Sequence, residues 1–556
     1  MKSKNGIVII SLFIVCVTLF FLRKITQNDY LYFSFFVMVA ITITEVLTTI
    51  TKNQKNEIFL LREKLTGLLT PRLLYLSVIV WFAVLSFMSV GQFNSFNSKM
   101  FDLGNMDQAI WNSSRGNWLE STTMHPPFSN MSRLYVHVEP IYLFFAAIYR
   151  LYADPRILLI SQVLLCALSI IIIYKIALLI LKDQKKAVMT GFVFALFPSL
   201  QFMAMKDFHG DILAIPFLLL SYLYYIKDKK VLYWFFLFIA LLCKEYVALA
   251  VVGFGLTLFT MHKDKKTAIL TSALGTVYFL VSLYVIIPAF NSGQESALLG
   301  VNYGEIGGEK GLSSIVLFAI RNPGQFVNTL MTHHNMENLF YLLFPLFITP
   351  FRAFGYLFGF FPILLKDLMA GLDIFNHRPG PGVPFLFIAF IYGLQKETRI
   401  SKLKSRLNIE YLLRLSLVSA AIASFAYGPT PLGHRFWREQ DRYIRDEKAL
   451  TISEIIKEIP SDAPVSVSEH IAPHLTHRRY CYVFPRPMTI DKLDIGKVEY
   501  ICIDTTDRVS LFYGDTSYIS QTIPRVIKTG FSKVKESGGV FLFKLNRDRQ
   551  HGECIR

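Results

Sequence analysis

Apolar runs near the length of a membrane span recur along most of this chain, and they restrict it to folding within a bilayer. A helix needs about 20 apolar residues to cross the hydrocarbon core. The composition agrees, since 53% of the residues are hydrophobic, only 17% are charged and the mean hydropathy is +0.42. We therefore predict a mainly α, polytopic transmembrane bundle of about 12–13 spans. The expected spans lie near residues 7–22, 30–50, 74–92, 157–181, 187–205, 212–226, 231–243, 247–261, 267–289, 336–349, 353–369, 381–396 and 408–427.

The positive charge is concentrated in short loops between these runs. The net charge is +17 and the pI about 9.4, but this distribution indicates membrane orientation and no nucleic-acid partner. The positive-inside rule places the basic loops in the cytoplasm and the intervening loops outside. The sequence thus predicts a multi-pass protein of the plasma membrane. Its basic clusters lie at residues 182–186, 227–230, 263–266 and 396–406.

The composition divides the chain into three regions. Residues 1–73 are expected to form a two-span hairpin and a cytoplasmic linker, and residues 74–430 the polytopic core. Residues 431–556 begin with the amphipathic stretch YIRDEKALTISEIIKEI. The short β-type runs PVSVS, RYCYVF, VEYICID and GGVFLFKL follow it. We expect this last region to be a small α/β domain on the extracytoplasmic side.

Acidic residues follow the span at 74–92, in the stretch MFDLGNMDQAIWN. Asn105 and Gln108 have the spacing of a capping box, which would place Asp107 in the first helical turn. Asp102 precedes that expected helix, at the end of the span. It is a candidate general base or a ligand for a divalent cation, Mg²⁺ or Mn²⁺. A merely solvated interfacial aspartate is the alternative.

A second polar feature, Lys244-Glu245, interrupts about thirty apolar residues. Two charges there are expensive unless the chain turns. We expect two short helices that meet near the outer face with this pair at their junction. Either the two charges neutralise each other, or Lys244 offers a cation to a phosphate.

Two further outer loops carry ionisable residues. KDFHGD supplies Lys206, His209 and Asp211 between two spans, in a pattern compatible with phosphate or metal contacts or with a plain polar loop. HVEP supplies His137 and Glu139 before EPIYLFFAAIYRLY, an apolar helix too short to span, which we expect along the interface.

Taken in order, FDLGNMDQAIWN, HVEP, KDFHGD, LLCKEYVAL, NHRPGPGVPFLF and APVSVSEHIAPHLTHRRYCYVFP resemble a prokaryotic family of membrane proteins of unknown function. That family in turn resembles the GT-C class of polytopic glycosyltransferases. The resemblance implies a polyprenyl-phosphate-sugar donor, Asp102 as the catalytic loop acid with Asp107 as second candidate, and Lys244 as the lysine at the central turn. The family often has His-Tyr where this chain has His377-Arg378, so the resemblance carries over His377 alone.

The leading hypothesis is a glycosyltransferase that passes a lipid-linked sugar to an extracytoplasmic acceptor. Lys206, Lys244 and Arg378 would supply cations for the leaving phosphate. The alternative is a transporter or lipid flippase with an outward-facing cavity, for which polar breaks at the bilayer midplane and paired inverted halves would be typical. A scaffold whose C-terminal domain does the work would leave the polar residues between the spans unexplained. Membrane lipids are expected partners in every case.

Overall fold

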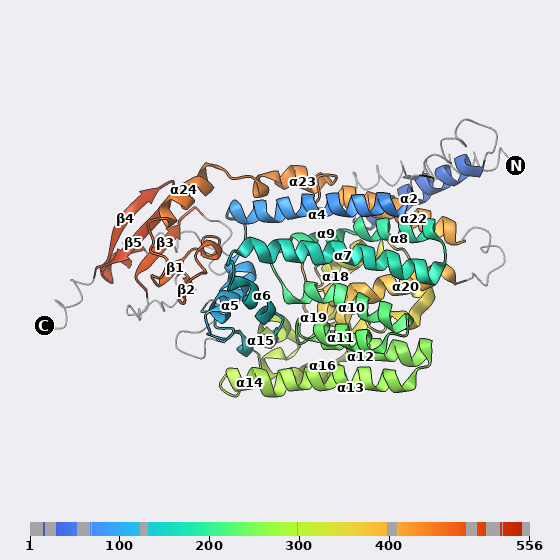
Figure 1. Ribbon diagram of the computed structural model, residues 1–556, viewed down its shortest axis with the longest axis horizontal. Coiled ribbons are helices and arrows are strands. Elements are labelled where there is room, and N and C mark those ends of the chain that lie inside the picture. The colour runs from blue at the N-terminus through green and yellow to red at the C-terminus, as the bar shows by residue number, and fades with distance from the viewer. Residues whose placement is uncertain are drawn as a thin grey trace.

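The computed structural model describes residues 15–16, 29–52, 67, 69–122, 132–296, 298–396, 408–484, 498–506, 523–524 and 526–546. Long helices lie side by side in a bundle, and a small sheet stands at one end of it (Figure 1). Apart from residues 15–16, the first expected span near 7–22 lies outside the described residues, as does most of the linker after Lys52. The helices are α2 (Asp29–Lys52), α4 (Pro71–Asn94), α5 (Asn105–Ser114), α6 (Tyr142–Tyr149), α7 (Pro155–Leu181), α8 (Gln184–Ala195), α9 (Pro198–Met205), α10 (Gly210–Ile226), α11 (Lys230–Leu241), α12 (Val247–Thr257), α13 (Lys265–Val281), α14 (Ile287–Phe290), α15 (Leu298–Tyr303), α16 (Leu312–Arg321), α17 (Pro323–Leu330), α18 (His333–Leu343), α19 (Phe361–Met369), α20 (Val383–Gln395), α22 (Ile409–Tyr427), α23 (His434–Glu439) and α24 (Glu447–Ile456).

Four of the described helices are long and apolar enough to cross a membrane alone: Pro71–Asn94, Pro155–Leu181, Lys265–Phe290 and Ile409–Tyr427. The pair α8 and α9, bent by 53°, forms a fifth crossing if it is one broken span. Other expected spans are present as apolar helices of 10–17 residues, among them α10, α11 and α20. These helices are shorter than the ~20 residues of a full crossing, and they pack among the longer ones.

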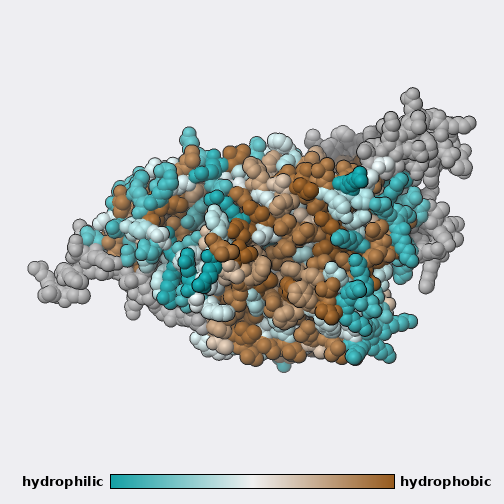
Figure 2. All heavy atoms as spheres, in the orientation of Figure 1, coloured by the Kyte–Doolittle hydropathy of each residue, from teal (hydrophilic) through white to brown (hydrophobic). Residues whose placement is uncertain are grey.

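The surface of the bundle is apolar in its middle and polar at both ends. Figure 2 shows a broad hydrophobic region over the bundle, flanked by hydrophilic residues on the side of the sheet and on the opposite side. Apolar side chains of the bundle such as Leu76, Ile79 and Phe87 of α4 are exposed. A soluble protein would bury such a face, so this band is the lipid-facing surface of a membrane protein.

Two local expectations were wrong. No capping box starts at Asn105, because a π-helical turn, Met100–Gly104, runs directly into α5 and Gly104 already has helical dihedrals. Asn105 instead accepts a hydrogen bond from Ser121 Oγ (2.8 Å). Likewise, 353–369 is no continuous span, since a 3₁₀ helix, Pro350–Leu357, breaks at Ala353 before α19 begins.

The C-terminal region folds as a five-stranded sheet in the order β2-β1-β3-β5-β4. Strands β1 (Val465–Val467), β2 (Cys481–Val483) and β3 (Tyr500–Asp504) are parallel, and β5 (Val540–Leu545) joins β3 antiparallel. Helix α24 packs its apolar face into the core of the sheet through Ala449, Ile452 and Ile455. The helix and four of the strands arise from the segments expected from the sequence.

The sequence pattern did not reveal the edge strand β4 (Phe531–Ser537). Its sequence, FSKVKES, exposes nearly every side chain, and only Phe531 is buried. An edge strand pairs through its backbone and tolerates lysines that discourage further pairing. Its hydrophobic alternation is therefore too weak to read from the sequence.

The C-terminal domain docks on the first loop of the core through His474. The imidazole stacks between Phe93 and Phe96, with ring centroids 4.1 and 3.9 Å away, and its Nε2 lies 2.9 Å from the Phe93 carbonyl oxygen. Burial lowers the pKa of His474 to about 3, so the ring is neutral when docked. Phe96 and Met100 extend this contact into the core of the sheet domain.

A second docking contact is electrostatic and centres on Asp107, whose carboxylate is fully buried. It accepts hydrogen bonds from Tyr149 Oη (2.6 Å) and from the Thr476 hydroxyl, and His477 Nε2 lies 3.1 Å from its Oδ2. Next to it, Gln108 Nε2 donates to the backbone carbonyls of Arg478 and Arg479. These polar contacts fix the sheet domain above α5.

The ion pair of His477 with Asp107 makes the docking pH-dependent. Burial opposes the imidazolium, but Asp107 outweighs burial and raises the pKa of His477, with Asp154 assisting and Arg115 opposing. Because the folded-state pKa of His477 is raised, the ion pair contributes its full stabilisation of the folded protein below the ordinary pKa of about 6.5. This stabilisation is lost as the pH rises through the raised folded-state pKa. We expect the melting temperature of the purified protein to fall over this interval and the His477→Gln variant to show a flatter profile.

His474→Gln is the matched control for this pH dependence. His474 lies in the same turn but is neutral in the folded protein, so its replacement lowers the melting temperature and leaves the slope above about pH 7.5 unchanged. Below the ordinary pKa its lowered value makes stability rise with pH, and His474→Gln removes that rise. A wild-type melting temperature that stays constant or rises above pH 6.5 would contradict the role given to His477.

Candidate active site

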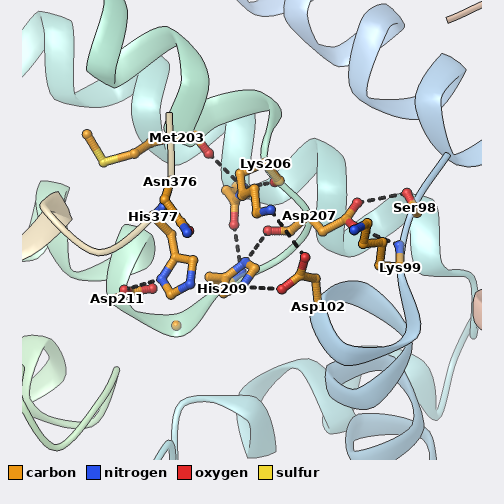
Figure 3. Close-up of polar contacts among 12 residues, drawn as sticks. Ser98, Lys99, Asp102, Met203, Lys206, Asp207, His209, Asp211, Asn376 and His377 are labelled. Atoms are coloured by element: carbon orange, nitrogen blue, oxygen red, sulfur yellow. Dashed lines mark hydrogen bonds and ion pairs between the residues drawn. The ribbon is translucent and has the colours of Figure 1, made fainter. Parts of the chain in front are cut away.

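The centre of the candidate site is Asp102, which projects from the π-helical turn between α4 and α5. Lys206 Nζ lies 3.2 Å from its Oδ2, and His209 Nε2 lies 3.3 Å from its Oδ1 (Figure 3). Burial raises the pKa of the Asp102 carboxyl, but Lys206 and His209 outweigh burial and hold it well below its ordinary value. The carboxylate is therefore ionised, and its side chain remains 23% exposed.

The loop that carries Lys206 and His209 is fixed by a buried carboxylate, Asp207. This side chain accepts hydrogen bonds from Ser98 Oγ (2.7 Å) and the Lys99 backbone amide (2.9 Å), both just after α4. Figure 3 shows Asp207 turned toward Ser98 and Lys99, and His209 toward Asp102. The loop after α9 is thus hydrogen-bonded to the loop after α4 through Asp207. These contacts fix the positions of Lys206 and His209 relative to Asp102.

Gln162 of α7 fixes the same loop from a third direction. Its Nε2 donates to the backbone carbonyls of Met203 (3.0 Å) and Lys206 (2.6 Å), and its Oε1 accepts from the His209 amide (2.9 Å). Three hydrogen bonds from one buried amide thus satisfy backbone groups around the end of α9 that would otherwise lie unpaired. The loop after α9 therefore holds Lys206 and His209 in fixed positions.

His377 extends the site on the side away from Asp102. Its ring stacks on His209 with centroids 3.7 Å apart, and its Nδ1 lies 2.6 Å from Asp211 Oδ2. The Tyr246 hydroxyl donates to the same Asp211 oxygen. Burial lowers the pKa of His377 well below its ordinary value despite the Asp211 charge. The imidazole is thus held neutral, with a fixed orientation.

A second, fully buried ionic cluster surrounds Glu139. Arg133 Nε lies 2.7 Å from its Oε2, Lys244 Nζ 3.3 Å from its Oε1, and the Tyr142 hydroxyl donates to Oε1 (3.1 Å). Burial raises the pKa of Glu139, but the two cations outweigh it and lower that pKa to about 2. Glu245 and Asp211 also act on Lys244, so the charges of this buried cluster offset one another.

Lys244 and Glu245 lie at the junction of α11 and α12, as expected, but each binds a different partner. Glu245 accepts from the Val138 amide (3.0 Å) and lies 2.8 Å from His137 Nδ1, while Lys244 binds Glu139. The pair therefore does not neutralise itself. Instead, Lys244 and Glu245 hold the junction of α11 and α12 against the loop that carries His137 and Glu139. Only 3% of the Lys244 side chain is exposed, so Lys206, at 29%, is the more accessible cation.

The structure places Asp107 and Arg378 outside the contacts of Asp102. Asp107 binds the docked C-terminal domain, as described above. Arg378 Nη2 donates to Asn302 Oδ1 (3.1 Å) and follows His377 directly in the chain. Within the described residues, no group of three or more His, Cys, Asp or Glu side chains is arranged to hold a metal ion.

Sequence reasoning missed four residues that shape the site: Asp207, Gln162, Tyr246 and Arg133. Asp207 stood inside the KDFHGD motif, which was a detectable signal. Gln162 is a single polar residue in a long apolar run, which was itself a usable signal. Tyr246 and Arg133 carried none, because their roles depend on contacts with Asp211 and Glu139.

The comparisons with known proteins agree with this architecture. Residues 92–537 match the family described as "Predicted membrane protein (DUF2079)". The chain belongs to this family. No match is found among curated proteins.

Two solved structures are similar to this chain over most of its length. ArnT from Cupriavidus metallidurans bound to undecaprenyl phosphate has 12% sequence identity and a TM-score of 0.51, covering 84% of this chain and 97% of its own. The apo state of the same protein has 12% identity and a TM-score of 0.45, covering 84% and 96%. The first likeness confirms the helical membrane fold of the GT-C kind.

Gly210 lies where the polar cluster around Asp102 meets the cluster around Glu139. A substitution at Gly210 therefore tests how closely the two clusters pack. Its amide donates to the Tyr142 hydroxyl (3.2 Å), and a Cβ there would lie 2.2 Å from the Cys243 carbonyl oxygen and 3.1 Å from Glu139 Oε1. Gly210→Ala must push the Lys244 turn away. We expect a loss of about 1–3 kcal/mol of unfolding free energy, measured by denaturation in detergent.

Gly324→Ala in α17 is the matched control for this substitution. A Cβ at Gly324 meets no atom within 4 Å, and alanine is the better helix former by about 0.5–1 kcal/mol. This variant should be neutral or slightly more stable. If Gly210→Ala and Gly324→Ala were equally stable, the start of α10 would not pack closely against the Lys244 turn.

Proposed function

We propose that this protein is a membrane glycosyltransferase that moves a sugar from a polyprenyl-phosphate-linked donor to an acceptor hydroxyl at the extracytoplasmic face. One observation carries the proposal. Asp102 and Lys206 form an ion pair that is partly exposed, while the residues that position them, Asp207 and His209, are buried. A rigid network thus presents one carboxylate and one cation to the outside of a membrane bundle.

The shared fold with ArnT supports the donor class. The solved ArnT structure holds undecaprenyl phosphate, which is a polyprenyl phosphate. A donor of this class keeps its chain in the bilayer and places its phosphate and sugar at the membrane surface. Asp102 follows the end of α4, a helix long enough to span, so it lies where such a headgroup meets water.

In the proposed reaction, the acceptor oxygen attacks the anomeric carbon and the bond from that carbon to the phosphate oxygen breaks. The acceptor proton passes to Asp102, and the polyprenyl phosphate leaves with the electron pair. Lys206 neutralises the negative charge that grows on the phosphate. A base must lie within hydrogen-bond reach of the hydroxyl, which the partly exposed Asp102 side chain allows.

The Asp102–Lys206 pair explains how a carboxylate with a low pKa acts as a base. In the free protein Lys206 holds the pKa of Asp102 down, and such a carboxylate accepts a proton poorly. A donor phosphate competes with Asp102 for Lys206. Once Lys206 turns to the phosphate, the carboxylate loses its strongest cation and its pKa rises. Donor binding thereby activates the base.

The remaining polar residues have supporting roles in this proposal. His209 and His377 hold the carboxylates of Asp102 and Asp211 in fixed positions. Lys244 and Arg133 hold Glu139 in place beside the site, and Arg378 is a second cation near it. Asp107, the second candidate for the base, is enclosed by the docked C-terminal domain, so we assign it to docking.

Replacement of the carboxylate tests the catalytic assignment. Asp102→Asn retains size and polarity but removes the proton acceptor, so turnover should fall by about 10²–10⁴. Lys206→Gln should weaken donor binding and also lower turnover, because Lys206 binds the phosphate and neutralises the charge that grows on it. Cells that lack the gene should accumulate a polyprenyl-phosphate sugar, and lipid-linked sugar analysis should show that Asp102→Asn does not reverse this accumulation.

The control for this experiment is Asp154→Asn. Asp154 caps α7 through the Arg156 amide (2.9 Å), and asparagine is an equally good cap. This variant should restore the wild-type lipid profile. Restoration by an Asp102→Asn protein expressed at the wild-type level would remove Asp102 from the chemistry. Absence of any lipid-linked sugar accumulation in the deletion strain would instead favour the transporter alternative.

The proposed orientation has a separate test. The basic clusters at 182–186, 227–230 and 263–266 join helices at the end away from Asp102, and the positive-inside rule makes that end cytoplasmic. Reporter fusions after Lys186, Lys230 and Lys266 should report cytoplasm, and a fusion after Trp437 should report the outside. An inside signal after Trp437 would reverse the proposed face.

A further inference from the structure

A cavity of about 430 Å³ lies at the end of the bundle opposite the Asp102 site. It opens where α10 ends, and the 17 residues of α10 separate it from Asp211 by roughly 25 Å. The proposed reaction does not use this cavity. Its walls include Tyr225, Tyr233, Trp234, Tyr392, Asp228 and Asp264.

The aromatic walls of this cavity are held in place by their neighbours. Tyr233 and Trp234 meet edge to face, 4.8 Å between ring centroids, and the Tyr233 hydroxyl bonds Thr271 Oγ1 (2.5 Å). The Tyr392 ring stacks on Tyr356 at 3.9 Å. Tyr233 is only 1% exposed, whereas Tyr225, Trp234 and Tyr392 are partly exposed. Aromatic faces carry negative potential, so these partly exposed rings favour an organic cation.

The charges on the cavity wall favour a cation too. Asp228 and Asp264 come from two copies of the sequence Lys-Asp-Lys-Lys, at 227–230 and 263–266. Of the lysines in these copies, all of which the structure describes, Lys230 lies on the wall, while the others are exposed outside it. Two carboxylates and one lysine make the interior acidic, and the surrounding lysines make its rim basic.

We propose that this cavity binds the headgroup of an ethanolamine phospholipid. The ammonium lies against the aromatic rings between Asp228 and Asp264, and the phosphate meets Lys230 and the rim lysines. A volume of about 430 Å³ is within the usual range for a small-ligand site. A glycerol headgroup carries no ammonium, so it would gain nothing from the negative charges of Asp228 and Asp264. This inference stands apart from the proposed glycosyl transfer.

The expected occupant can be tested by lipid retention. Detergent-purified protein is exposed to equimolar phosphatidylethanolamine and phosphatidylglycerol, and native mass spectrometry measures the bound lipids. We expect phosphatidylethanolamine to be retained at least about tenfold over phosphatidylglycerol, and the Asp228→Asn/Asp264→Asn variant to lose this preference. Asparagine keeps the backbone roles, since Asp228 has φ +53° and Asp264 caps α13.

Asp183→Asn is the matched control, because Asp183 caps α8 in a basic loop outside the cavity. It should retain phosphatidylethanolamine as the wild type does. Trp234→Leu, which removes one ring and no charge, should weaken retention on its own. Equal retention of both lipids, or full retention by the double variant, would overturn the proposal. Binding of soluble phosphoethanolamine without retention of the lipid would overturn the assignment to a phospholipid.

Discussion

The buried carboxylate of Asp207 is the contact on which the candidate site depends. A charge inside the protein is tolerated only where hydrogen bonds satisfy it, and Asp207 finds its donors in Ser98 and Lys99, more than a hundred residues away in the chain. This contact joins the turn after α4 to the turn after α9. Asp102, Lys206 and His209 then lie in contact because this link holds the backbones of the two turns together. Burial and the nearby Asp102 charge raise the pKa of Asp207, while Lys206 and the hydrogen bonds from Lys99 and Ser98 act to lower it.

The two ends of the bundle divide the chemistry between them. At one end, carboxylates and cations from five separate segments neutralise one another in a nearly closed network around Glu139, Asp211 and Asp102. At the other end, lysines project from short loops around an acidic, aromatic cavity. Apolar helices separate the ends, and because charges are expensive within the bilayer, polar function is confined to its two surfaces.

The C-terminal domain completes the first of these ends. Its turn from His474 to His477 rests on Phe93, Phe96 and Asp107, so it covers the segment that leads into and out of the Asp102 turn. The neutral His474 contributes packing, and the pair of His477 with Asp107 contributes charge. The same short loop thus carries the candidate base and the docking site of the domain, which couples the position of Asp102 to the presence of the domain.

The sequence by itself determined the class of the protein, the position of most helices and four of the five strands, because hydrophobic length and alternation are local properties. It also named Asp102, Lys206, His209 and Lys244, since charged residues beside apolar runs stand out. It did not determine partners. Lys244 binds Glu139 and not its neighbour, and Asp107 holds a domain that lies 370 residues away in the chain. Tertiary structure alone decided these pairings, because a buried charge selects whichever opposite charge the packing of distant helices brings within reach, and no local pattern records that choice.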